Sequence, residues 1–527
     1  MAPAGFAVSR LGDVVFSGGP VVTMDARTEG ATAVVVRDGR ILATGGAELV
    51  AASREADRVD LAGATLVPGF IDAHNHLSVA ALHPCFGDAS AVRSVEDLHA
   101  VLREHAAANP DAEFVRLHGW DENHWGFAVD RGVLDAAVGD RPVVLAHYSL
   151  HQCVANSVAL DRLGIGRSTP DPQAGEIGRD PDGLPNGLLV ERAWSEAHAR
   201  SLTAYADADR WAEHIAARAR QLLRDGVTAV HNAACSPEAE TVYRAMAAAG
   251  TLPVSVLALP HPAALLRNEP GGRLEGPPTG EGSEAFRIGA MKLFADGGVS
   301  IALDTAIGGR PVRYGVLMDD LEACAVRATD RGFRLAVHAI GNVGVERALD
   351  VFETVARGKR EDDHRFRIEH AGITGPRDWQ RAAALGAIGV VQPGFVEHVG
   401  RQSHGVRFDD HHWLAFAGLA EAGVTLAGSS DDPCAPSAPL WCIDKGVRRT
   451  TSTGIAFEPE QSVPFADWLH AYTMGAAFAG GQEHERGSIT PGKRADFVAL
   501  DLAARPPRVA ATWIAGACVW PGNNRPN

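Results

Sequence analysis

Cysteine is scarce in this sequence, and its spacing argues against a disulfide framework. Seven cysteines occur in 527 residues, an odd number, and no two of them form a Cys-x-x-Cys motif. This usage fits free, buried thiols in a reducing compartment. We therefore expect a cytoplasmic protein.

Long runs of a single kind of side chain are absent as well. No apolar stretch reaches the ~18–20 residues that a membrane span needs, and no long run of Lys or Arg occurs. The formal net charge of -16 gives the chain no attraction to phosphate backbones. The first residues lack a basic segment followed by a long apolar one, so we expect no signal peptide. We expect neither a nucleic-acid partner nor a membrane partner.

The two ends of the chain are rich in β-branched residues. The segments DVVFSGGPVVTMD and TAVVVRDGRILATGG lie within the first 65 residues, and RADFVALDL and VAATWIAGACVW lie near the end. Glycine and Asp-Gly turns break these runs into short strands. The pattern predicts one small β-sandwich domain built from residues 1–65 and 481–527.

The middle of the chain alternates short apolar runs with helix-like segments. The apolar runs are typical of fully buried strands. Eight occur, in TLVPGFIDAH and at residues 226–232, 252–259, 286–297, 333–341, 365–371, 386–394 and 423–432. Eight strand–helix units predict an α/β fold, a (β/α)8 TIM-like barrel over residues 66–480. The gap after the first strand is too long for one helix, so residues 78–200 are predicted to form an insertion, a cap or lid over one face of the barrel.

Residues that can bind a metal stand at the ends of five of these strands. His74 and His76 share one face of the first strand, because strand side chains alternate. The other strand-end residues are Lys292, His338, His370 and Asp431. A barrel gathers the carboxyl ends of its strands around one mouth, where such enzymes carry their chemistry. The six residues are therefore predicted to converge on a metal site.

This order resembles the signature of the amidohydrolase superfamily, with His-x-His on strand 1, Lys on strand 4, His on strands 5 and 6 and Asp on strand 8. The segment GSITPGKRADFVALD is similar to the superfamily's usual C-terminal motif. Further stretches resemble one branch, the N-substituted formamide deformylase-like amidohydrolases (metal-dependent amidohydrolase family 3). They are GWDENHW, HQCVANSVAL, GEIGRDPDGLPNGLLVE, MKLFADGGVS, VHAIGN and RIEHA. The resemblance covers nearly the whole chain.

The resemblance implies a metal-dependent hydrolase of a non-peptide amide or N-substituted formamide C–N bond. One or two divalent metal ions, Zn²⁺ being the best match to imidazole and carboxylate ligands, would be bound by His74, His76, Lys292, His338, His370 and Asp431. The metal would lower the pKa of bound water to roughly 7, and Asp431 would act as general base and then as general acid. Lys292 either carries a CO₂-derived carbamate that bridges two metals, as in many superfamily members, or remains an ammonium ion paired to a carboxylate.

Two details depart from the branch or require a choice. The branch commonly has Asp after HAIG, whereas this sequence has Asn342, which removes a charge one turn beyond a ligand. The segment GSSDDP offers two adjacent acids, and the branch's Ser-Asp-x-Pro pattern selects Asp431 over Asp432.

Three residues of the predicted insertion are candidate substrate contacts, namely Trp120, Asp121 and His151. Trp120 and Asp121 would either close over a substrate or order the lid. His151 precedes a predicted helix that ends near Gly164, and it would either line the pocket or form a hydrogen bond near the helix start.

Two alternatives remain. The same metal site would serve a deaminase or a cyclic-amide hydrolase, and product analysis separates these activities because deamination releases ammonia whereas deformylation releases formate. A non-catalytic metal-binding scaffold predicts the loss of a ligand or of the aspartate, and none is missing. The expected partner is a small-molecule amide or formamide. Dimers are common in the superfamily, so the resemblance also suggests a homodimer.

Overall fold

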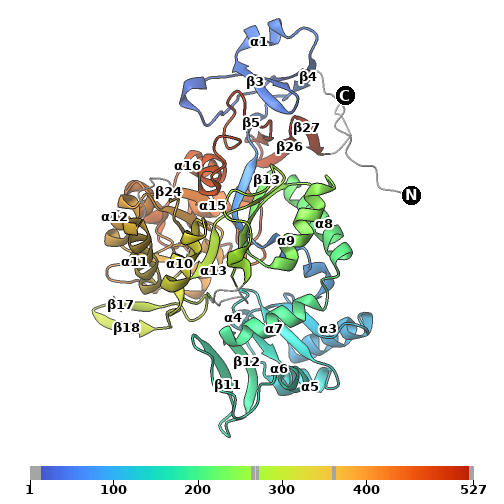
Figure 1. Cartoon of the computed structure of the whole chain (residues 1–527), viewed down its shortest axis with the longest axis vertical. Helices are drawn as coiled ribbons and strands as arrows, with labels where there is room; N and C mark the ends of the chain where they lie inside the picture. The colour runs from blue at the N-terminus through green and yellow to red at the C-terminus, as the bar shows by residue number, and fades with distance from the viewer. Residues whose placement is uncertain (1–12, 263–267, 269–271, 359–363, 522–527) are drawn as a thin grey trace.

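The computed structural model describes residues 13–262, 268, 272–358 and 364–521, and two parallel sheets form its centre (Figure 1). One sheet has the order β15-β14-β13-β6 and consists of β6 (Phe70–Asn75), β13 (Val227–Cys235), β14 (Ser255–Pro260) and β15 (Phe286–Ile288). The other has the order β16-β19-β20-β22-β24 and consists of β16 (Met291–Phe294), β19 (Leu335–Ala339), β20 (Arg367–His370), β22 (Ile388–Val391) and β24 (Thr425–Gly428). Each of the eight predicted segments contains a strand. The first is divided into β5 (Thr65–Pro68), which joins another sheet, and β6, and the fourth is divided into β15 and β16.

The ends of the two sheets lie next to each other. Asp431, just after β24, donates its backbone N–H to the carbonyl oxygen of His74 on β6, with 2.8 Å between the two atoms. At the other end, only Gly289 and Ala290 separate β15 from β16. Every residue of β6 and of β14 is buried, as expected of parallel strands that are covered on both faces. The chain therefore has an α/β, TIM-barrel-like fold.

Helices cover these strands, and α8 (Ala208–Arg224) illustrates why they form. The side chain of its N-cap residue Asp207 accepts a hydrogen bond from the backbone N–H of Arg210. Its buried residues recur every three or four positions, as in an amphipathic helix, at Trp211, Ile215, Ala219, Leu222 and Leu223. The later helices are α9 (Pro237–Ala248), α10 (Leu321–Asp330), α11 (Asn342–Gly358), α12 (Pro376–Ala384), α13 (Phe395–Gln402), α14 (Phe416–Glu421), α15 (Pro439–Arg448), α16 (Phe465–His470) and α17 (Ala476–Gly480). Across the described ranges, none of the helices has the length and apolar character needed to span a bilayer.

Strands from both ends of the chain pack against each other at the top of Figure 1. The N-terminal sheet, in the order β3-β2-β1-β4, consists of β1 (Val14–Ser17), β2 (Ala33–Arg37), β3 (Arg40–Gly45) and β4 (Asp57–Asp60). The C-terminal sheet, in the order β27-β26-β25-β5, consists of β5 (Thr65–Pro68), β25 (Phe497–Asp501), β26 (Arg508–Ile514) and β27 (Ala517–Trp520). The ring of Phe16 packs edge-on against Phe497 and Trp513, with centroids 5.2 and 5.3 Å apart. The two ends thus share one hydrophobic core.

The residues between β6 and α8 form a further sheet at the opposite end of the molecule (Figure 1). This sheet, in the order β11-β12-β10-β9-β8-β7, consists of β7 (Gly87–Asp88), β8 (Val115–Trp120), β9 (Val143–His147), β10 (Gln152–Ala155), β11 (Gly175–Arg179) and β12 (Pro185–Glu191). Its helices are α3 (Val95–Ala108), α4 (Glu122–Trp125), α5 (Arg131–Ala137), α6 (Ser157–Leu163) and α7 (Arg192–Thr203). The loop 149–151 and part of α7 line a cavity at the carboxyl ends of the central strands, which brings this insertion to the candidate site.

Candidate metal centre

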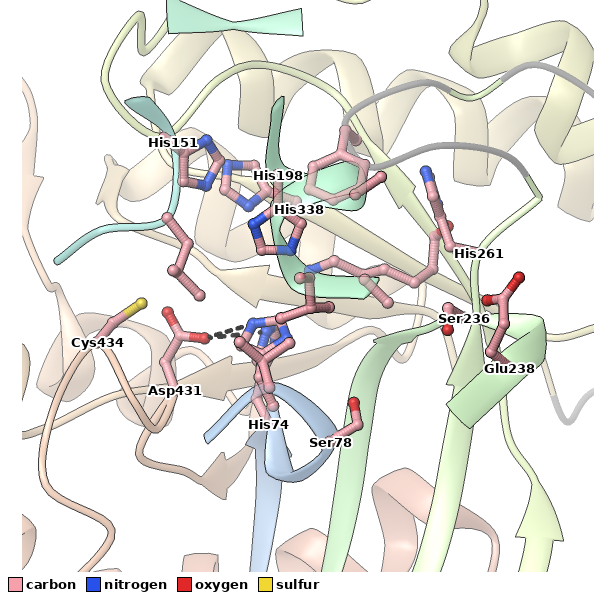
Figure 2. A pocket seen from close by; sticks show the side chains of 18 of the residues that line it. His74, Ser78, His151, His198, Ser236, Glu238, His261, His338, Asp431 and Cys434 are labelled. Carbon is pink, nitrogen blue, oxygen red and sulfur yellow. Dashed lines mark hydrogen bonds and ion pairs between the residues drawn. The ribbon is translucent and has the colours of Figure 1, made fainter. Parts of the chain in front are cut away.

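The six predicted ligands lie where the central strands end. Four of them lie on strands: His74 on β6, Lys292 on β16, His338 on β19 and His370 on β20. His76 directly follows β6, and Asp431 follows β24. Parallel strands bring these ends together at one mouth. All six side chains line one cavity, of about 410 Å³ (Figure 2). The most accessible of the four histidines is His76, whose side chain is 17% exposed.

The carboxylate of Asp431 is at the centre of this group. Its Oδ1 atom lies 3.0 Å from Nε2 of His76 and 3.3 Å from Nε2 of His74, and dashed lines mark these contacts in Figure 2. Within the described part of the chain, Oδ1 accepts no hydrogen bond of acceptable geometry. Although burial would raise the pKa of Asp431, the neighbouring histidines hold it below its usual range. A buried carboxylate oxygen thus faces ring nitrogens without being used by the protein itself.

Three of the histidines are oriented by oxygen atoms behind them. The Nδ1 atom of His74 lies 2.5 Å from Oε2 of Glu369. Nδ1 of His76 lies 3.1 Å from the carbonyl oxygen of Ala233, and Nδ1 of His370 lies 3.0 Å from Oε1 of Gln392. These acceptors favour a proton on Nδ1, and they leave the Nε2 lone pair free. Burial also lowers the pKa of His74 to about 4 and that of His370 to about 3, so both rings are neutral at pH 7. Neutral rings with a free Nε2 are suited to bind a metal.

The residues that hold these rings carry little signal in the sequence. Arg367 donates from Nε to Oε1 of Glu369, 2.7 Å away, and so fixes the carboxylate that contacts His74. Glu369 directly precedes His370, and regular strand alternation would direct the two side chains to opposite faces. The backbone of His370 instead adopts a φ of 76°, in the left-handed region, and both side chains contact His74. The only available signal was the carboxylate inside the motif RIEHA.

Lys292 is fully buried beside the histidines. Burial lowers the pKa of its amine to about 8. Among the described residues, no carboxylate lies within ion-pair distance of its Nζ, which sits 5.2 Å from the centroid of the Phe294 ring. The ammonium–carboxylate pair, one of the two alternatives for this residue, is therefore not present among the described residues.

The donor set fits a divalent metal ion. Donor atoms of His74, His370 and Asp431 all lie within 4.8 Å of one another. The ligands of a tetrahedral zinc ion are ~3.3–3.5 Å apart, because each lies ~2.0–2.1 Å from the metal. The 3.0 and 3.3 Å separations at Asp431 Oδ1 are close to that value. Imidazole nitrogens and a carboxylate also match the ligand preference of zinc.

Two cavities meet at this centre. The first cavity is the one that all six candidate ligands line, and the second cavity, of about 280 Å³, lies on the other side of Asp431 toward α13. Both are lined by Ser149, His151, His338, His370, Asp431 and Cys434. Cavities of this size at the carboxyl ends of such strands commonly hold small molecules.

The three predicted substrate contacts have different positions. His151 lines both cavities, and its Nδ1 lies 2.7 Å from Oε2 of the buried Glu191. Trp120 packs in the core of the insertion and lines neither cavity. Asp121 caps α4 by accepting a hydrogen bond from Asn123 N–H. It lines a third hollow, which shares His147, Tyr148 and Cys434 with the second cavity but contains none of the six candidate ligands. The structure thus brings only His151 to the metal centre, and a substrate role for the other two stays a prediction.

The departure at Asn342 and the choice between Asp431 and Asp432 both have local explanations. The side chain of Asn342 accepts a hydrogen bond from Asp304 N–H (3.1 Å) and donates one to the Asp304 carbonyl (2.9 Å). It thereby anchors the hairpin of β17 (Leu303–Ile307) and β18 (Arg310–Tyr314). Asp432 pairs with Arg218 at 2.7 Å, whereas Asp431 faces the histidines. The choice of Asp431 over Asp432 agrees with this geometry.

Comparisons with known proteins agree in family and fold. The model of the amidohydrolase family matches residues 57–520. An N-substituted formamide deformylase of Arthrobacter pascens is 34% identical over 511 residues, which cover 94% of each chain. The crystal structure of an uncharacterized metal-dependent hydrolase from Pyrococcus furiosus shares 25% identity at a TM-score of 0.71, covering 93% of this chain and 99% of that one. One from Pyrococcus horikoshii OT3 shares the fold, with 24% identity at a TM-score of 0.73 and coverage of 93% and 97%.

The family match spans most of the chain, and the relative from Arthrobacter pascens aligns along nearly the full length of both proteins. The resemblance found in the sequence motifs is therefore confirmed. The chain belongs to the amidohydrolase family and is a metal-dependent hydrolase that acts on carbon–nitrogen bonds other than peptide bonds.

Proposed function

We propose that this protein hydrolyses an amide or N-substituted formamide C–N bond, with Asp431 as general base and general acid. The observation that carries the proposal is the unused Oδ1 of Asp431, which faces the Nε2 atoms of His74 and His76. A relative named N-substituted formamide deformylase, which aligns along nearly the whole chain, supports the bond type.

The metal would be Zn²⁺, in one or two copies, held by His74, His76, Lys292, His338, His370 and Asp431. When bound, it supplies a Lewis acid for the carbonyl group and a water whose pKa is lowered to roughly 7. Glu369, Ala233 and Gln392 keep the Nδ1 atoms of three ligands occupied, so that Nε2 remains directed at the centre.

Lys292 is proposed to be carboxylated. Its buried amine has a pKa lowered to about 8, which increases the neutral, nucleophilic fraction at pH 7. The neutral amine would attack the carbon of CO₂ through Nζ and release one proton, which gives an anionic carbamate. Counted from the ammonium ion, two protons are released. A carbamate would satisfy a group that has no described carboxylate partner, and its two oxygens could bridge two metal ions.

The proton transfers fall to Asp431. Its carboxylate accepts a proton from the attacking water. It then donates this proton to the amide nitrogen as the C–N bond breaks. His151, which Glu191 orients across the junction of the two cavities, would contact the substrate beside the reacting carbonyl.

Product analysis tests this function directly. The metal-loaded enzyme should convert an N-substituted formamide into equal amounts of formate and amine. The variant Asp431→Asn should lower kcat by about 10²–10⁴-fold. Metal content must be measured in the same samples, because a loss of activity without loss of metal separates proton transfer from ligation. Release of ammonia from cyclic amidines, with no turnover of formamides, would replace the proposal by the deaminase alternative, and turnover of cyclic amides alone would favour a cyclic-amide hydrolase.

The number of metal ions is measured separately. Elemental mass spectrometry of protein purified without chelators should give close to two zinc equivalents per chain if the Lys292 carbamate bridges two ions. A value near one would contradict the bridge, and none after incubation with zinc would contradict the metal site itself.

The architecture around the site is part of the same proposal. The eight strand segments would close into one barrel over residues 66–480, a closure that the hydrogen bond from Asp431 N–H to the His74 carbonyl supports. Residues 1–65 and 481–527 would form one β-sandwich domain, which the contacts of Phe16 support. Residues 78–200 would act as the lid.

A further inference from the structure

Open space lies on both sides of the candidate metal centre. The first and second cavities meet at Asp431, and the loop 149–151 together with Cys434 forms the edge between them. Figure 2 shows Asp431, Cys434 and His151 on the left of the view, away from Ser236 and Glu238, which line the first cavity on the right. A substrate whose reacting carbonyl sits at Asp431 would therefore find room for a substituent in each direction.

The second cavity has an apolar wall that reaches the metal centre. Phe395 and Val399 of α13 line it together with Trp413 and Leu414. The ring of Phe395 lies parallel to that of His370, with centroids 6.1 Å apart. A formamide carries only hydrogen on its carbonyl carbon, so it would leave this wall facing water. An acyl chain would cover the wall, and burying apolar surface is favourable.

The charges around the two cavities distinguish the two ends of a substrate. Among the described residues that line them there is no arginine, and the only lysine is Lys292. Glu238 lines the first cavity and has no ion pair within the described ranges. The second cavity contains Glu122, which pairs with His147 at 2.9 Å. Amide hydrolysis at neutral pH yields a protonated amine and a carboxylate, so the amine is complementary to the first cavity and the carboxylate is better tolerated in the second.

We infer that the enzyme hydrolyses uncharged N-substituted carboxamides whose acyl chain extends beyond formyl. The N-substituent occupies the first cavity and the acyl chain occupies the second, an assignment that rests on the proposed amide hydrolysis. In the reaction, the oxygen of water bonds to the carbonyl carbon, the C–N bond breaks, and the nitrogen takes up a proton. The products are R–COO⁻ and R′–NH₃⁺ from R–CO–NH–R′ and water.

A substrate series with a constant amine tests the inference on the unaltered enzyme. N-phenethylformamide, N-phenethylacetamide and N-phenethylbutanamide all release phenethylamine, so one amine assay gives kcat/KM for each. The acetamide and butanamide values should lie within about tenfold of the formamide value, because the second cavity accepts the added carbons. Turnover of the formamide with the other two slower by more than about a hundredfold would overturn the inference and leave the proposed function standing. No turnover of any member would overturn both.

A pair of variants tests which cavity holds the acyl chain. Val399→Phe should narrow the second cavity and lower the butanamide-to-formamide ratio of kcat/KM at least about tenfold. Ala199→Leu is the matched control, because Ala199 lines only the first cavity, which holds the same phenethyl group in every substrate. It should lower all three kcat/KM values together. An unchanged ratio in a folded Val399→Phe enzyme, or a ratio that changes only in Ala199→Leu, would overturn the assignment.

A charged analogue tests the electrostatic part on the unaltered enzyme, independently of the folding of any variant. N-formylphenylalanine is the carboxylated counterpart of N-phenethylformamide. Since no arginine occurs among the described residues that line the first cavity, its kcat/KM should be at least about tenfold lower. Equal values for the two compounds would contradict the exclusion of charged substrates.

Discussion

Three histidines of the candidate centre, His74, His76 and His370, are each oriented by an oxygen atom behind the ring. His370 reaches the centre through a left-handed backbone conformation, and Asp431 shares this feature with a φ of 60°. Strain of this kind persists where surrounding contacts impose it. For His370 one such contact is Gln392, whose side-chain nitrogen donates in turn to Ser429 Oγ at 2.9 Å. The ligand geometry is therefore built by chains of hydrogen bonds and not by the ligands alone.

Replacing a ligand should remove metal and activity while leaving the fold largely intact. His74→Ala is expected to lower kcat/KM by at least about 10³-fold, because both the metal and the water that it activates depend on this site. Steady-state kinetics, elemental analysis and circular dichroism on one preparation check this. His484→Ala, at a histidine whose side chain is 89% exposed, is the control and should retain both metal and activity. Full activity in His74→Ala would contradict the ligand assignment.

Removing an acceptor behind a ligand should weaken metal binding without abolishing it. Gln392→Leu deprives His370 Nδ1 of its acceptor, so the ring can rotate or change tautomer. Metal affinity should fall about 10–100-fold, as is typical for such partners. Competition with a chelator of known affinity measures this. Unaltered affinity would mean that packing alone holds the ring.

At the scale of elements, short segments are tied together by single polar side chains. Glu397 on α13 binds Lys445 of α15, and it also accepts hydrogen bonds from the backbone N–H and hydroxyl of Ser452, both at 2.7 Å. This connection holds the helix whose residues line the second cavity. Asn342 likewise holds the β17–β18 hairpin through its two hydrogen bonds to the backbone of Asp304.

The contact at Glu397 should make stability depend on pH. Burial opposes ionisation, but Lys445 and Ser452 outweigh it and lower the pKa of Glu397 from 4.5 to about 2. A depressed folded-state pKa contributes stability above pH 4.5, which is lost as the pH falls toward 2. Glu397→Gln should therefore destabilise the protein by on the order of 1–2 kcal/mol at pH 7 and by less near pH 3. Thermal unfolding of both proteins at the two pH values checks this, and an equal difference at each pH would contradict it.

Restoring the branch's usual residue at position 342 should loosen the hairpin. Asn342→Asp keeps the acceptor for Asp304 N–H but sets a carboxylate oxygen against the Asp304 carbonyl. The lost hydrogen bond should cost about 1–3 kcal/mol locally. Hydrogen exchange of residues 303–314 should accelerate. Arg310→Lys, at an exposed position of the same hairpin, is the control, and equal exchange in the two variants would contradict the role of Asn342.

At the scale of the whole molecule, the terminal sheets and the candidate site lie in different parts of the fold. The two terminal sheets pack at one end of the central strands, and the insertion meets the candidate site at the other (Figure 1). The metal centre lies between, where chain segments more than 350 residues apart meet, as at His74 and Asp431. A metal ion there binds only the folded state.

Metal removal should consequently lower stability across the whole molecule. Chelator-treated protein should remain folded but unfold at a lower temperature, and added zinc should restore the midpoint. Binding at 1,000 times the dissociation constant contributes about 4 kcal/mol. Calorimetry of the two forms checks this, with His74→Ala expected to respond less to zinc. Identical midpoints with and without metal would contradict the coupling.

The sequence motifs identified the family, the apolar pattern indicated the eight strand segments, and the polar strand ends predicted the residues of the proposed metal centre. They could do so because a buried parallel strand is apolar along its length, so a polar residue at its carboxyl end stands out, as His338 does in LAVHAIG. The motifs also selected Asp431 over Asp432, in agreement with the Arg218 pair.

Only the tertiary structure decided what holds and surrounds these residues. His370 lies beside Glu369 at His74 because the backbone turns left-handed at His370, and periodicity carries no signal of that. Trp120 belongs to the core of the insertion and His151 to the cavities, although both come from motifs of the same segment. The two cavities arise from α7, α13 and the loop 149–151, which are far apart in sequence. The shape of the cavities depends on how these elements pack, and a pattern along the sequence does not show which distant segments come together.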